Sequence, residues 1–333
     1  MVIYKLPACF FPTTLGLWFR LTHTAASRSP LQIIPDDTPR RALMYCPGDD
    51  MRKINKGINS KADCIALDCE DGVAINRKKE ARATIRSVLD AGNLPKRPEV
   101  GVRVNAVDSG LCEDDLSVIL SASNPPAALY LPKVESRDNL LWFAEKLDKY
   151  LVHNVTVKLV IFAESARAIM DLPEICKAAM ELSQNHKLVP VGLVFGSDDL
   201  CASIGAARSV DGGEIMYARQ RLVLVAKAFG LQAVDMVHIQ YKDLDSLRQQ
   251  SEAGARLGYT GKQVIHPDQI EIVQKAFLPS REQLQWARDV VDGFRASQQQ
   301  GKGAFVHAGS MVDMPLLRQA ENIIRLSGID QNS

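Results

Sequence analysis

The sequence lacks several features that mark common functional classes. Its 333 residues carry 40 basic and 39 acidic side chains, and a net charge of +1 gives no overall field that attracts nucleic acid or an anionic membrane. The seven cysteines contain no Cys-x-x-Cys pair, and the six histidines form no cluster that would complete a zinc site. The apolar run from Ala8 to Phe19 is short of the ~20 residues that span a bilayer. We therefore expect no nucleic-acid or membrane partner, and any anion site must be local.

Acidic residues are also missing from the first 35 positions, which carry three basic residues and several Ser and Thr. This composition is typical of a mitochondrial transit peptide. A secretory signal is the alternative. The odd number of cysteines opposes it, because Cys64, Cys69 and Cys176 lie in or beside apolar segments and indicate buried free thiols in a reducing compartment. The sequence predicts a transit peptide over residues 1–38 and a mature protein in the mitochondrial matrix.

After Arg40, apolar segments typical of buried strands alternate with amphipathic segments typical of helices. The expected strands are 41–46, 63–69, 99–105, 127–132, 157–163, 189–195, 232–239 and 262–266. The expected helices are 50–59, 76–90, 137–150, 165–182, 214–229 and 244–257, with Asp49 as the cap of the first. Strict alternation of eight strands with helices predicts a TIM (β/α)8 barrel over residues 39–278. A doubly wound open sheet is the competitor, but its glycine-rich turn is absent after the first strand.

Residues 279–333 are expected to form a C-terminal helical extension. Two helices, 281–298 and 315–327, are separated by a glycine-rich link, and Pro315 suits the first turn of the second. The segment is too short for us to expect a core of its own. We therefore expect it to pack on the barrel or on a neighbouring subunit.

Carboxylates follow four of the apolar runs. They are Asp68, Glu70 and Asp71 after residues 65–67, Glu164 after 159–163, Asp198 and Asp199 after 191–195, and Asp313 after 309–312. Carboxylates at the end of a buried strand are costly unless they are paired or bind a cation. Because the carboxyl ends of barrel strands meet at one mouth, and oxygen ligands suit Mg²⁺, the sequence predicts a magnesium site there.

Glu164 and Asp199 are the predicted ligands, since they follow adjacent strands. Mg²⁺ takes one or two carboxylates and completes its shell with water and substrate oxygens. The alternative for both positions is helix capping, and one member of the Asp198–Asp199 pair is expected to cap while the other binds metal. The remaining acids, Asp68, Glu70 and Asp71, are expected to surround the metal site as supporting groups or to pair with Arg103.

Two basic residues also follow strands. Arg103 ends the third strand, and its guanidinium can grip a carboxylate with two hydrogen bonds. Its alternative is a structural ion pair with the Asp68 cluster, and both roles can hold. Lys133 follows the fourth strand, where a Schiff-base lysine would be placed. Pairing with Glu135 or Glu164 would keep it charged, so a metal-assisted route is favoured.

Three further positions complete the set of candidate site residues. Arg52 and Lys56 are four residues apart on the first helix, so they can form an anion clamp beside Tyr45 at the barrel mouth. Their alternative is a solvated helix face. Asp313 is expected to act as a general acid or base presented by the extension, or else as the N-cap of the last helix.

Seven motifs now point to a known family. In order they are Arg41-Ala-Leu-Met-Tyr-Cys-Pro-Gly48, Leu67-Asp-Cys-Glu-Asp-Gly-Val73, Arg103-Val-Asn105, Leu131-Pro-Lys-Val-Glu135, Phe195-Gly-Ser-Asp-Asp-Leu200, Gly261-Lys-Gln-Val-Ile-His-Pro267 and Gly309-Ser-Met-Val-Asp-Met-Pro315. Over residues 40–325 the chain resembles the citrate lyase β-subunit-like proteins of mitochondria, relatives of the malyl-CoA and citramalyl-CoA lyases of the HpcH/HpaI aldolase superfamily.

The resemblance implies a TIM barrel that assembles as a homotrimer. It implies Mg²⁺ held by Glu164 and Asp199, a 2-oxo acid held by Arg103, and Asp313 as catalytic acid/base, from its own subunit or a neighbouring one. It also implies that Tyr45, Arg52 and Lys56 contact the coenzyme A of an acyl-CoA substrate. Arg52 stands where the resemblance implies a lysine, which keeps the charge and changes its geometry.

The predicted activity is Mg²⁺-dependent carbon–carbon cleavage of an acyl-CoA thioester, citramalyl-CoA to acetyl-CoA and pyruvate. Malate synthase and β-methylmalate synthase side activities follow from the reverse chemistry. Two alternatives stay open from the sequence. One is a metal-dependent aldolase that acts on free hydroxy-oxo acids without CoA, and the other is a non-catalytic binding protein.

Overall fold

The structure is a computed structural model that describes residues 38–209, 211–301 and 303–331. The predicted transit peptide lies outside these residues, apart from Thr38. None of the helices formed by the described residues is long and apolar enough to cross a membrane.

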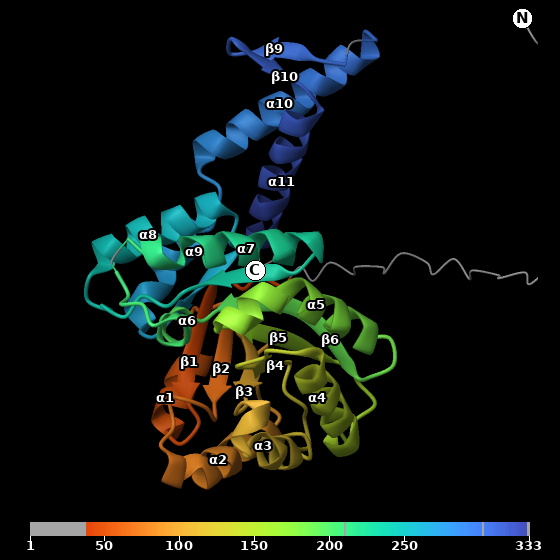
Figure 1. Ribbon diagram of the computed structural model, residues 1–333. Coiled ribbons are helices and arrows are strands. Elements are labelled where there is room, and N and C mark those ends of the chain that lie inside the picture. Colours follow the sequence, from red (N-terminus) through yellow and green to blue (C-terminus); the bar gives the residue numbers. More distant parts are fainter. Residues whose placement is uncertain (1–37, 210, 302, 332–333) are drawn as a thin grey trace, which may run out of the picture. The chain divides into compact units, whose positions relative to one another are not determined.

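A closed barrel of eight parallel strands forms the centre of the described chain (Figure 1). Each strand pairs with its neighbours in sequence, and β8 pairs with β1 to close the barrel. The predicted TIM barrel is therefore confirmed. The strands are β1 (Ala42–Pro47), β2 (Cys64–Asp68), β3 (Glu99–Arg103), β4 (Ala128–Leu131), β5 (Val157–Ala163), β6 (Leu188–Phe195), β7 (Gln232–Asp235) and β8 (Gly261–Val264).

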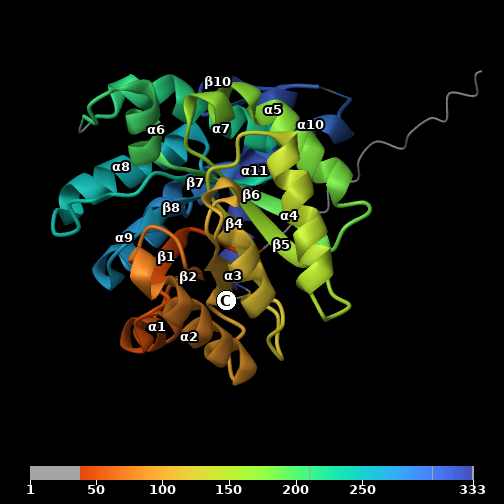
Figure 2. The same cartoon turned by 60° about the horizontal axis from the view of Figure 1, so that its bottom comes forward.

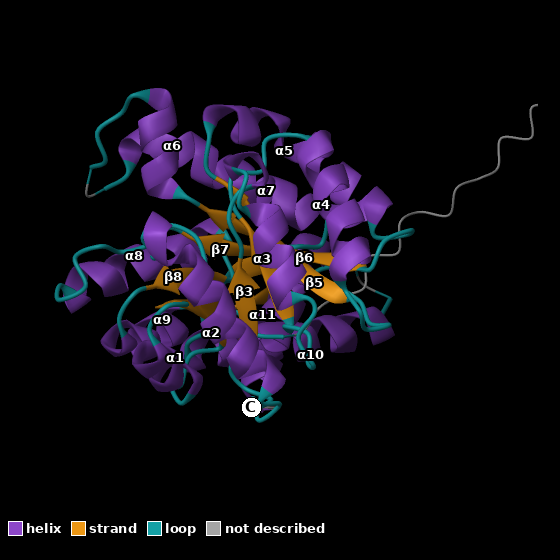
Figure 3. Cartoon of the chain, turned by 90° about the horizontal axis from the view of Figure 1, so that it is seen from below, coloured by secondary structure: helices purple, strands orange, loops and turns teal. Residues whose placement is uncertain are grey.

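Helices surround the strands, as Figure 2 and Figure 3 show from two further directions. Those of the barrel are α1 (Met51–Ile58), α2 (Lys78–Asp90), α3 (Cys112–Ile119), α4 (Arg137–Tyr150), α5 (Ala166–Leu182), α6 (Ser197–Ile204), α7 (Met216–Ala228), α8 (Leu244–Leu257) and α9 (Ile270–Ala276). Short 3-10 helices cover Ile75–Arg77, Val107–Ser109, Gly213–Ile215 and Pro267–Gln269. The sequence prediction omitted α3, α6 and α9, because two turns of helix show too little periodicity to be recognised.

Local residues fix several helix ends. Gly258 caps α8 at its C-terminus with φ 99°, and Gly230 follows α7 with φ 67°, conformations that favour glycine. Helix α1 begins after Asp50, whose side chain accepts a hydrogen bond from the Lys53 N–H at 3.1 Å. The prediction of Asp49 as this cap was therefore wrong by one residue, because the first free N–H groups lie nearer Asp50.

The strands bury both faces, which explains their nearly continuous apolar sequence. Inside the barrel, residues such as Leu43, Tyr130 and Phe162 form one cluster. Between the strands and the helices, a second and larger cluster includes Leu67, Ile85 and Phe143. The barrel is consequently a packed core rather than an open channel.

The cysteines of the described residues are free and buried, at positions 46, 64, 69, 112, 176 and 201. This confirms the prediction of buried thiols made for Cys64, Cys69 and Cys176. Burial raises the pKa of the Cys46 thiol and that of Cys176 to about 12. These thiols are therefore protonated at neutral pH and serve as small apolar side chains.

A buried ion cluster lies between the barrel and its helices. Asp235 at the end of β7 accepts two hydrogen bonds from Arg219 of α7, at 3.1 and 2.7 Å. Lys262 of β8 is wholly buried, with its ammonium 3.8 Å from Asp235 and without a hydrogen-bond partner in the described chain. Burial, opposed by Asp235 and aided by Arg219, lowers the pKa of Lys262 to about 8.

Replacing this lysine with methionine should stabilise the protein at neutral pH. The folded-state pKa of about 8 lies below the ordinary lysine value, so charging Lys262 costs stability at pH 7, and that cost fades as the pH rises above 8. We expect Lys262→Met to raise the free energy of unfolding by about 1–3 kcal/mol at pH 7. Urea unfolding at pH 7 and 9.5 should show the advantage shrinking at the higher pH. The same difference in free energy of unfolding at both pH values, or a variant less stable than the wild type at pH 7, would contradict this role.

The C-terminal extension comprises α10 (Arg281–Gln299), the hairpin strands β9 (Phe305–His307) and β10 (Ser310–Val312), and α11 (Met314–Gln331). Pro315 lies in the first turn of α11, as predicted. The expectation that this segment has no core of its own was wrong. Val290, Phe294 and Val312 form a buried cluster there, because two amphipathic helices and a hairpin cover one another.

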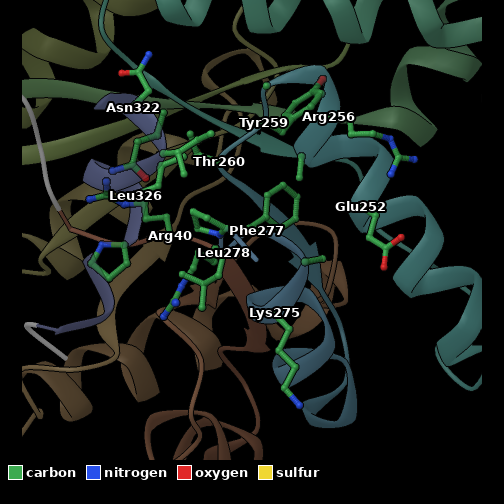
Figure 4. A pocket seen from close by; sticks show the side chains of 18 of the residues that line it. Arg40, Glu252, Arg256, Tyr259, Thr260, Lys275, Phe277, Leu278, Asn322 and Leu326 are labelled. Atoms are coloured by element: carbon green, nitrogen blue, oxygen red, sulfur yellow. The ribbon is translucent and has the colours of Figure 1, made fainter. Parts of the chain in front are cut away.

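A cavity of about 1220 Å³ separates part of α11 from the barrel. Figure 4 shows Asn322 and Leu326 of α11 lining the cavity together with Arg40 and Thr260 of the barrel. Arg40 precedes β1 and Thr260 precedes β8, so the cavity lies at the amino ends of the strands. The second half of α11 is therefore at the end of the barrel opposite the predicted site.

Candidate active site at the carboxyl ends of the strands

The predicted site residues of the barrel gather at the carboxyl ends of its strands. Asp68 ends β2 and Arg103 ends β3, and these two residues are direct partners in the strand register. Glu164 follows β5, and Asp199 lies in the first turn of α6, which follows β6. Strands β5 and β6 are adjacent, as the sequence interpretation required. In a parallel barrel this is the end that carries catalytic groups.

Arg103 is held by two carboxylates. Its Nε and Nη2 donate to the two Asp68 carboxylate oxygens at 2.8 and 2.7 Å, and its Nη1 lies 2.9 Å from Glu70. Its guanidinium also lies over the Tyr45 ring, 4.7 Å from the ring centroid. Burial alone would lower the pKa of Arg103, but the Asp68 and Glu70 carboxylates raise it above its ordinary value. The guanidinium therefore stays charged. The predicted structural ion pair is confirmed, and it fixes the orientation of the guanidinium.

The loop that carries these acids is itself tightly held. Asp68 accepts hydrogen bonds from the N–H groups of Glu70 and Gly72, at 2.8 and 2.9 Å. The buried Lys78 ammonium donates to the carbonyl oxygens of Cys69 and Glu70, each at 2.7 Å. These hydrogen bonds therefore fix the position of Glu70. Burial raises the pKa of Glu70, and Arg103 offsets part of that rise.

Glu164 does not cap a helix. Ser165 is the N-cap of α5, and Glu164 is buried just before it. Its Oε1 accepts a hydrogen bond from the backbone N–H of Lys133 at 2.7 Å. Burial and the neighbouring Asp199 carboxylate raise the pKa of Glu164 to about 8. The N–H and the charge of Lys133 oppose this rise only in part, so the charged form of Glu164 remains costly.

The two acids of α6 have different surroundings. Asp198 is paired with Arg208 at 2.7 Å, whereas the half-exposed Asp199 lies 4.0 Å from the Lys133 ammonium. The prediction that one member of the pair caps the helix was wrong, because the cap position is Gly196 and no side chain bonds there. Asp199 thus remains available beside Glu164.

The residues present fit a magnesium ion. A metal cage built by protein alone would need at least three His, Cys, Asp or Glu side chains close together. The described residues contain no such group. Mg²⁺ does not require one, since it is commonly bound by one or two carboxylates with water and substrate oxygens. A divalent cation next to Glu164 and Asp199 would offset the cost of ionising the buried carboxylate.

The residues predicted to contact coenzyme A fall into two places. Arg52 and Lys56 are exposed on α1. Tyr45 instead lies inside the mouth beneath Arg103, where its hydroxyl donates to Gln263 at 2.9 Å. Gln263 in turn donates to the carbonyl oxygens of Phe195 and Asp235 at 2.9 and 3.1 Å. Tyr45 is thus brought together with Arg103 rather than with the basic face of α1.

Asp313 is not brought to the barrel mouth of its own chain. It lies exposed between β10 and α11, where its carboxylate accepts a hydrogen bond from the Leu316 N–H at 3.4 Å. Figure 1 shows β9 and β10 at the tip of the extension, on the far side of the barrel from α1 and α2. Asp313 is nine residues before Asn322, so α11 carries it about 13 Å further from the cavity at the amino ends of the strands.

Sequence reasoning missed three supporting residues. Gln263 orients Tyr45, Lys78 holds the acidic loop, and Gly196 packs directly against Glu164. Gln263 and Gly196 stand in two of the motifs that resemble the family, so their neighbours gave a signal. Lys78 depends on contacts between distant segments, which have no local signature.

Gly196 gives a steric test of the Glu164 position. A methyl group at residue 196 would overlap the Glu164 carboxylate and its Cβ. We expect Gly196→Ala to displace Glu164 and to weaken Mg²⁺ binding by at least about tenfold, a cost of ~1.4 kcal/mol, as measured by calorimetric titration. Gly213→Ala serves as the control, because a methyl group there makes only an ordinary contact, 3.8 Å from a carboxylate oxygen of Asp211. Unchanged binding in Gly196→Ala would show that Glu164 is not a ligand.

Comparisons with known proteins agree with this geometry. The family model described as HpcH/HpaI aldolase/citrate lyase matches residues 41–267. The chain is 46% identical to human mitochondrial citramalyl-CoA lyase over 292 residues, covering 87% of this chain and 86% of that protein. The rat protein of the same name is 45% identical with the same coverage.

A solved structure extends the likeness to the fold. The CitE protein of Mycobacterium tuberculosis, in complex with magnesium, acetoacetate and coenzyme A, is similar with a TM-score of 0.71 and 31% identity. The similarity covers 88% of this chain and 99% of that one. Together with the barrel and its acidic mouth, these matches show that the chain belongs to the HpcH/HpaI aldolase/citrate lyase family.

Proposed function

We propose that the protein is a Mg²⁺-dependent carbon–carbon lyase that cleaves citramalyl-CoA to acetyl-CoA and pyruvate. The observation that carries this proposal is the junction at Glu70. That carboxylate accepts from Arg103 and from Lys133, and Lys133 in turn contacts Glu164 and Asp199. An anion-binding guanidinium and a carboxylate pair suited to a metal therefore share one mouth. The similarity to citramalyl-CoA lyases supports the choice of substrate.

The metal would be held by Glu164 and Asp199. When bound, Mg²⁺ supplies Lewis-acid stabilisation to the oxygens of the hydroxy acid and its 2-oxo product. Arg103 binds the carboxylate of that acid, and Asp68 and Glu70 hold the guanidinium in place. Because the Asp68 and Glu70 carboxylates already fix the guanidinium of Arg103, little reorganisation is needed when the substrate arrives.

Coenzyme A would bind along α1. Arg52 and Lys56 are exposed and carry no opposing charge between them on that face, so they suit the phosphate groups of the cofactor portion. Tyr45 lies against Arg103 and would contact the acyl end of the thioester. The related CitE protein was crystallised with coenzyme A, which supports a thioester substrate in preference to a free acid.

Asp313 would act as the proton donor from a neighbouring subunit. The second half of α11 lies at the amino ends of the strands, and a seven-residue strand such as β5 spans about 20 Å to the other end. Asp313 therefore has no route to the Glu164 of its own chain. Met311 and Met314 beside it are exposed apolar side chains, as expected of a surface that a neighbour covers. The homotrimer implied by the family resemblance would supply that neighbour.

The residues divide the reaction as follows. The hydroxyl proton of citramalyl-CoA passes to solvent water at the mouth, and the O–H electron pair forms the ketone of pyruvate. The C–C bond breaks, and its electron pair moves onto the thioester to form the enolate. Arg103 stabilises the carboxylate end of the forming pyruvate. Asp313, as the carboxylic acid, protonates the enolate carbon to give acetyl-CoA. In the reverse direction its carboxylate removes that proton, and the enolate adds to glyoxylate. Hydrolysis of the resulting thioester by water gives malate synthase activity with acetyl-CoA and β-methylmalate synthase activity with propionyl-CoA.

The proposed location is the mitochondrial matrix, with residues 1–38 as the transit peptide. The relatives from rat and human are named as mitochondrial proteins. The buried free thiols of the barrel fit a reducing compartment.

Removing the metal provides the test of this function. We expect purified protein to cleave (S)-citramalyl-CoA with Mg²⁺, to stop in EDTA, and to recover when excess Mg²⁺ is added. Acetyl-CoA and pyruvate are measured together, so that simple thioester hydrolysis is distinguished from C–C cleavage. Free citramalate should not be cleaved. Equal cleavage of the free acid would favour an aldolase, and absence of any turnover would reject the lyase.

A further inference from the structure

Lys133 has an unusual backbone at the barrel mouth. It follows β4 and has a φ of 54°, a left-handed conformation that the described chain shows at just one other non-glycine residue, Ala308. Lysine gains nothing locally from this conformation, so surrounding contacts must fix it. The conformation directs the Lys133 N–H to Glu164, at 2.7 Å from Oε1.

The side chain of Lys133 contacts three further acidic residues. Its ammonium donates to Glu70 at 2.5 Å and to Asp71 at 3.4 Å, and it lies 4.0 Å from Asp199. These groups come from the loop after β2 and from α6. One residue therefore contacts both proposed metal ligands and the loop that holds Arg103, and the proposed reaction assigns it no step.

The two kinds of contact have different consequences for a bound cation. The N–H stabilises the Glu164 carboxylate, which favours metal binding. The ammonium is a positive charge beside Asp199, so it competes with a divalent cation for that carboxylate. At the same time it shares Glu70 with Arg103, and thereby ties the Arg103 loop to the metal site.

We propose that Lys133 is a positioning residue that weakens intrinsic Mg²⁺ binding while aligning Arg103 and the metal carboxylates for the 2-oxo acid. The inference rests on the metal site of the proposed function and adds a role that a structural or covalent lysine would not have. Removing the charge should strengthen metal binding and impair substrate use, and these effects have opposite signs.

Lys133→Met retains the length of the side chain and removes its charge. In the absence of substrate we expect this variant to bind Mg²⁺ about tenfold more tightly, as measured by calorimetric titration. This is the repulsion that one positive charge exerts on a divalent cation at roughly 5 Å in a water-like dielectric. With Mg²⁺ saturating, we expect the KM for the 2-oxo acid in the synthase direction to rise about tenfold, from loss of one charge-assisted contact to the Arg103 loop. Lys133→Arg should restore both quantities toward the wild-type values.

Two further variants keep the test decisive. Lys133→Gly suits a φ of 54° and lacks the charge, so it should also bind Mg²⁺ more tightly even if Lys133→Met folds poorly. Lys146→Met serves as the control. Lys146 is another partly buried lysine, on α4, and pairs with Glu113 of α3 at 2.7 Å, so its removal should leave Mg²⁺ affinity unchanged.

The outcomes separate this inference from the proposed function. If the wild type cleaves citramalyl-CoA but neither uncharged variant binds Mg²⁺ more tightly, the role of Lys133 is wrong and the lyase stands. If the variants bind more tightly but the wild type does not turn over the thioester, the proposed reaction is wrong and the role of Lys133 stands. A failure of Lys133→Arg to restore either quantity, with an adduct trapped by borohydride in the wild type, would identify a Schiff-base lysine and reject the proposal.

Discussion

Asp313→Asn protein should lose turnover by about 10²–10⁴-fold while keeping its fold and its affinity for Mg²⁺. The amide can still accept the Leu316 N–H at the start of α11, so the helix should remain capped. What disappears is the proton that the enolate carbon of acetyl-CoA requires. Activity and circular dichroism, measured on the same preparation, separate lost chemistry from lost structure.

The same variant can show which subunit supplies the acid. Asp313→Asn chains retain a sound metal site, and Glu164→Gln chains retain a sound extension. If each site combines the barrel of one chain with the extension of another, an unfractionated mixture assembled at random from equal amounts regains about one quarter of wild-type activity, and heterotrimers purified through two different tags regain about one third. Mixtures as inactive as their parents would show that Asp313 serves its own barrel, or none.

Gly261→Ala should unfold the barrel or cost at least about 3 kcal/mol of stability. Gly261 begins β8, the strand that closes the barrel against β1. A methyl group there would overlap the carbonyl oxygen of Arg40 and lie 2.7 Å from that of Arg41. Neither neighbour is the flexible end of a side chain, so relief requires the two strands to separate.

Urea unfolding of Gly261→Ala measures this cost. Gly303→Ala is a suitable control, because a methyl group at residue 303 meets open space and should change stability by less than about 0.5 kcal/mol. Matching midpoints for Gly261→Ala and the wild type would mean that the seam between β1 and β8 is looser than described. A large loss confined to Gly261→Ala would identify this seam as a critical closure of the fold.

The sequence predicts the barrel well because burial on both faces leaves a readable pattern. The runs at 157–163 and 137–150 coincide with β5 and α4, since one is continuously apolar and the other has a helical period. Short elements such as α6 give no such period. The acids at strand ends could be located for the same reason, because a parallel barrel brings those ends together whatever the details of its loops.

Other features depend on contacts that no single segment encodes. Lys133 looked like a candidate Schiff-base residue, and its left-handed backbone and contacts with four acids emerge only once β2, β5 and α6 are assembled around it. Asp313 follows an apolar run like the other acids, yet its hairpin lies on an extension with a core of its own. A local pattern could not show that its position is at the opposite end of the molecule.

The buried cysteines bear on how the protein responds to oxidants. Cys69 stands between Asp68 and Glu70, in the centre of the acidic loop, yet its side chain is wholly buried and burial raises its pKa well above the ordinary value. Peroxide and alkylating reagents attack the thiolate, which this loop does not present. We therefore do not expect oxidation of Cys69 to regulate the site, although the thiol lies next to it in the chain. The rate at which a reagent alkylates Cys69 instead measures transient opening of the barrel, because the reagent can reach the thiol only when the surrounding core separates.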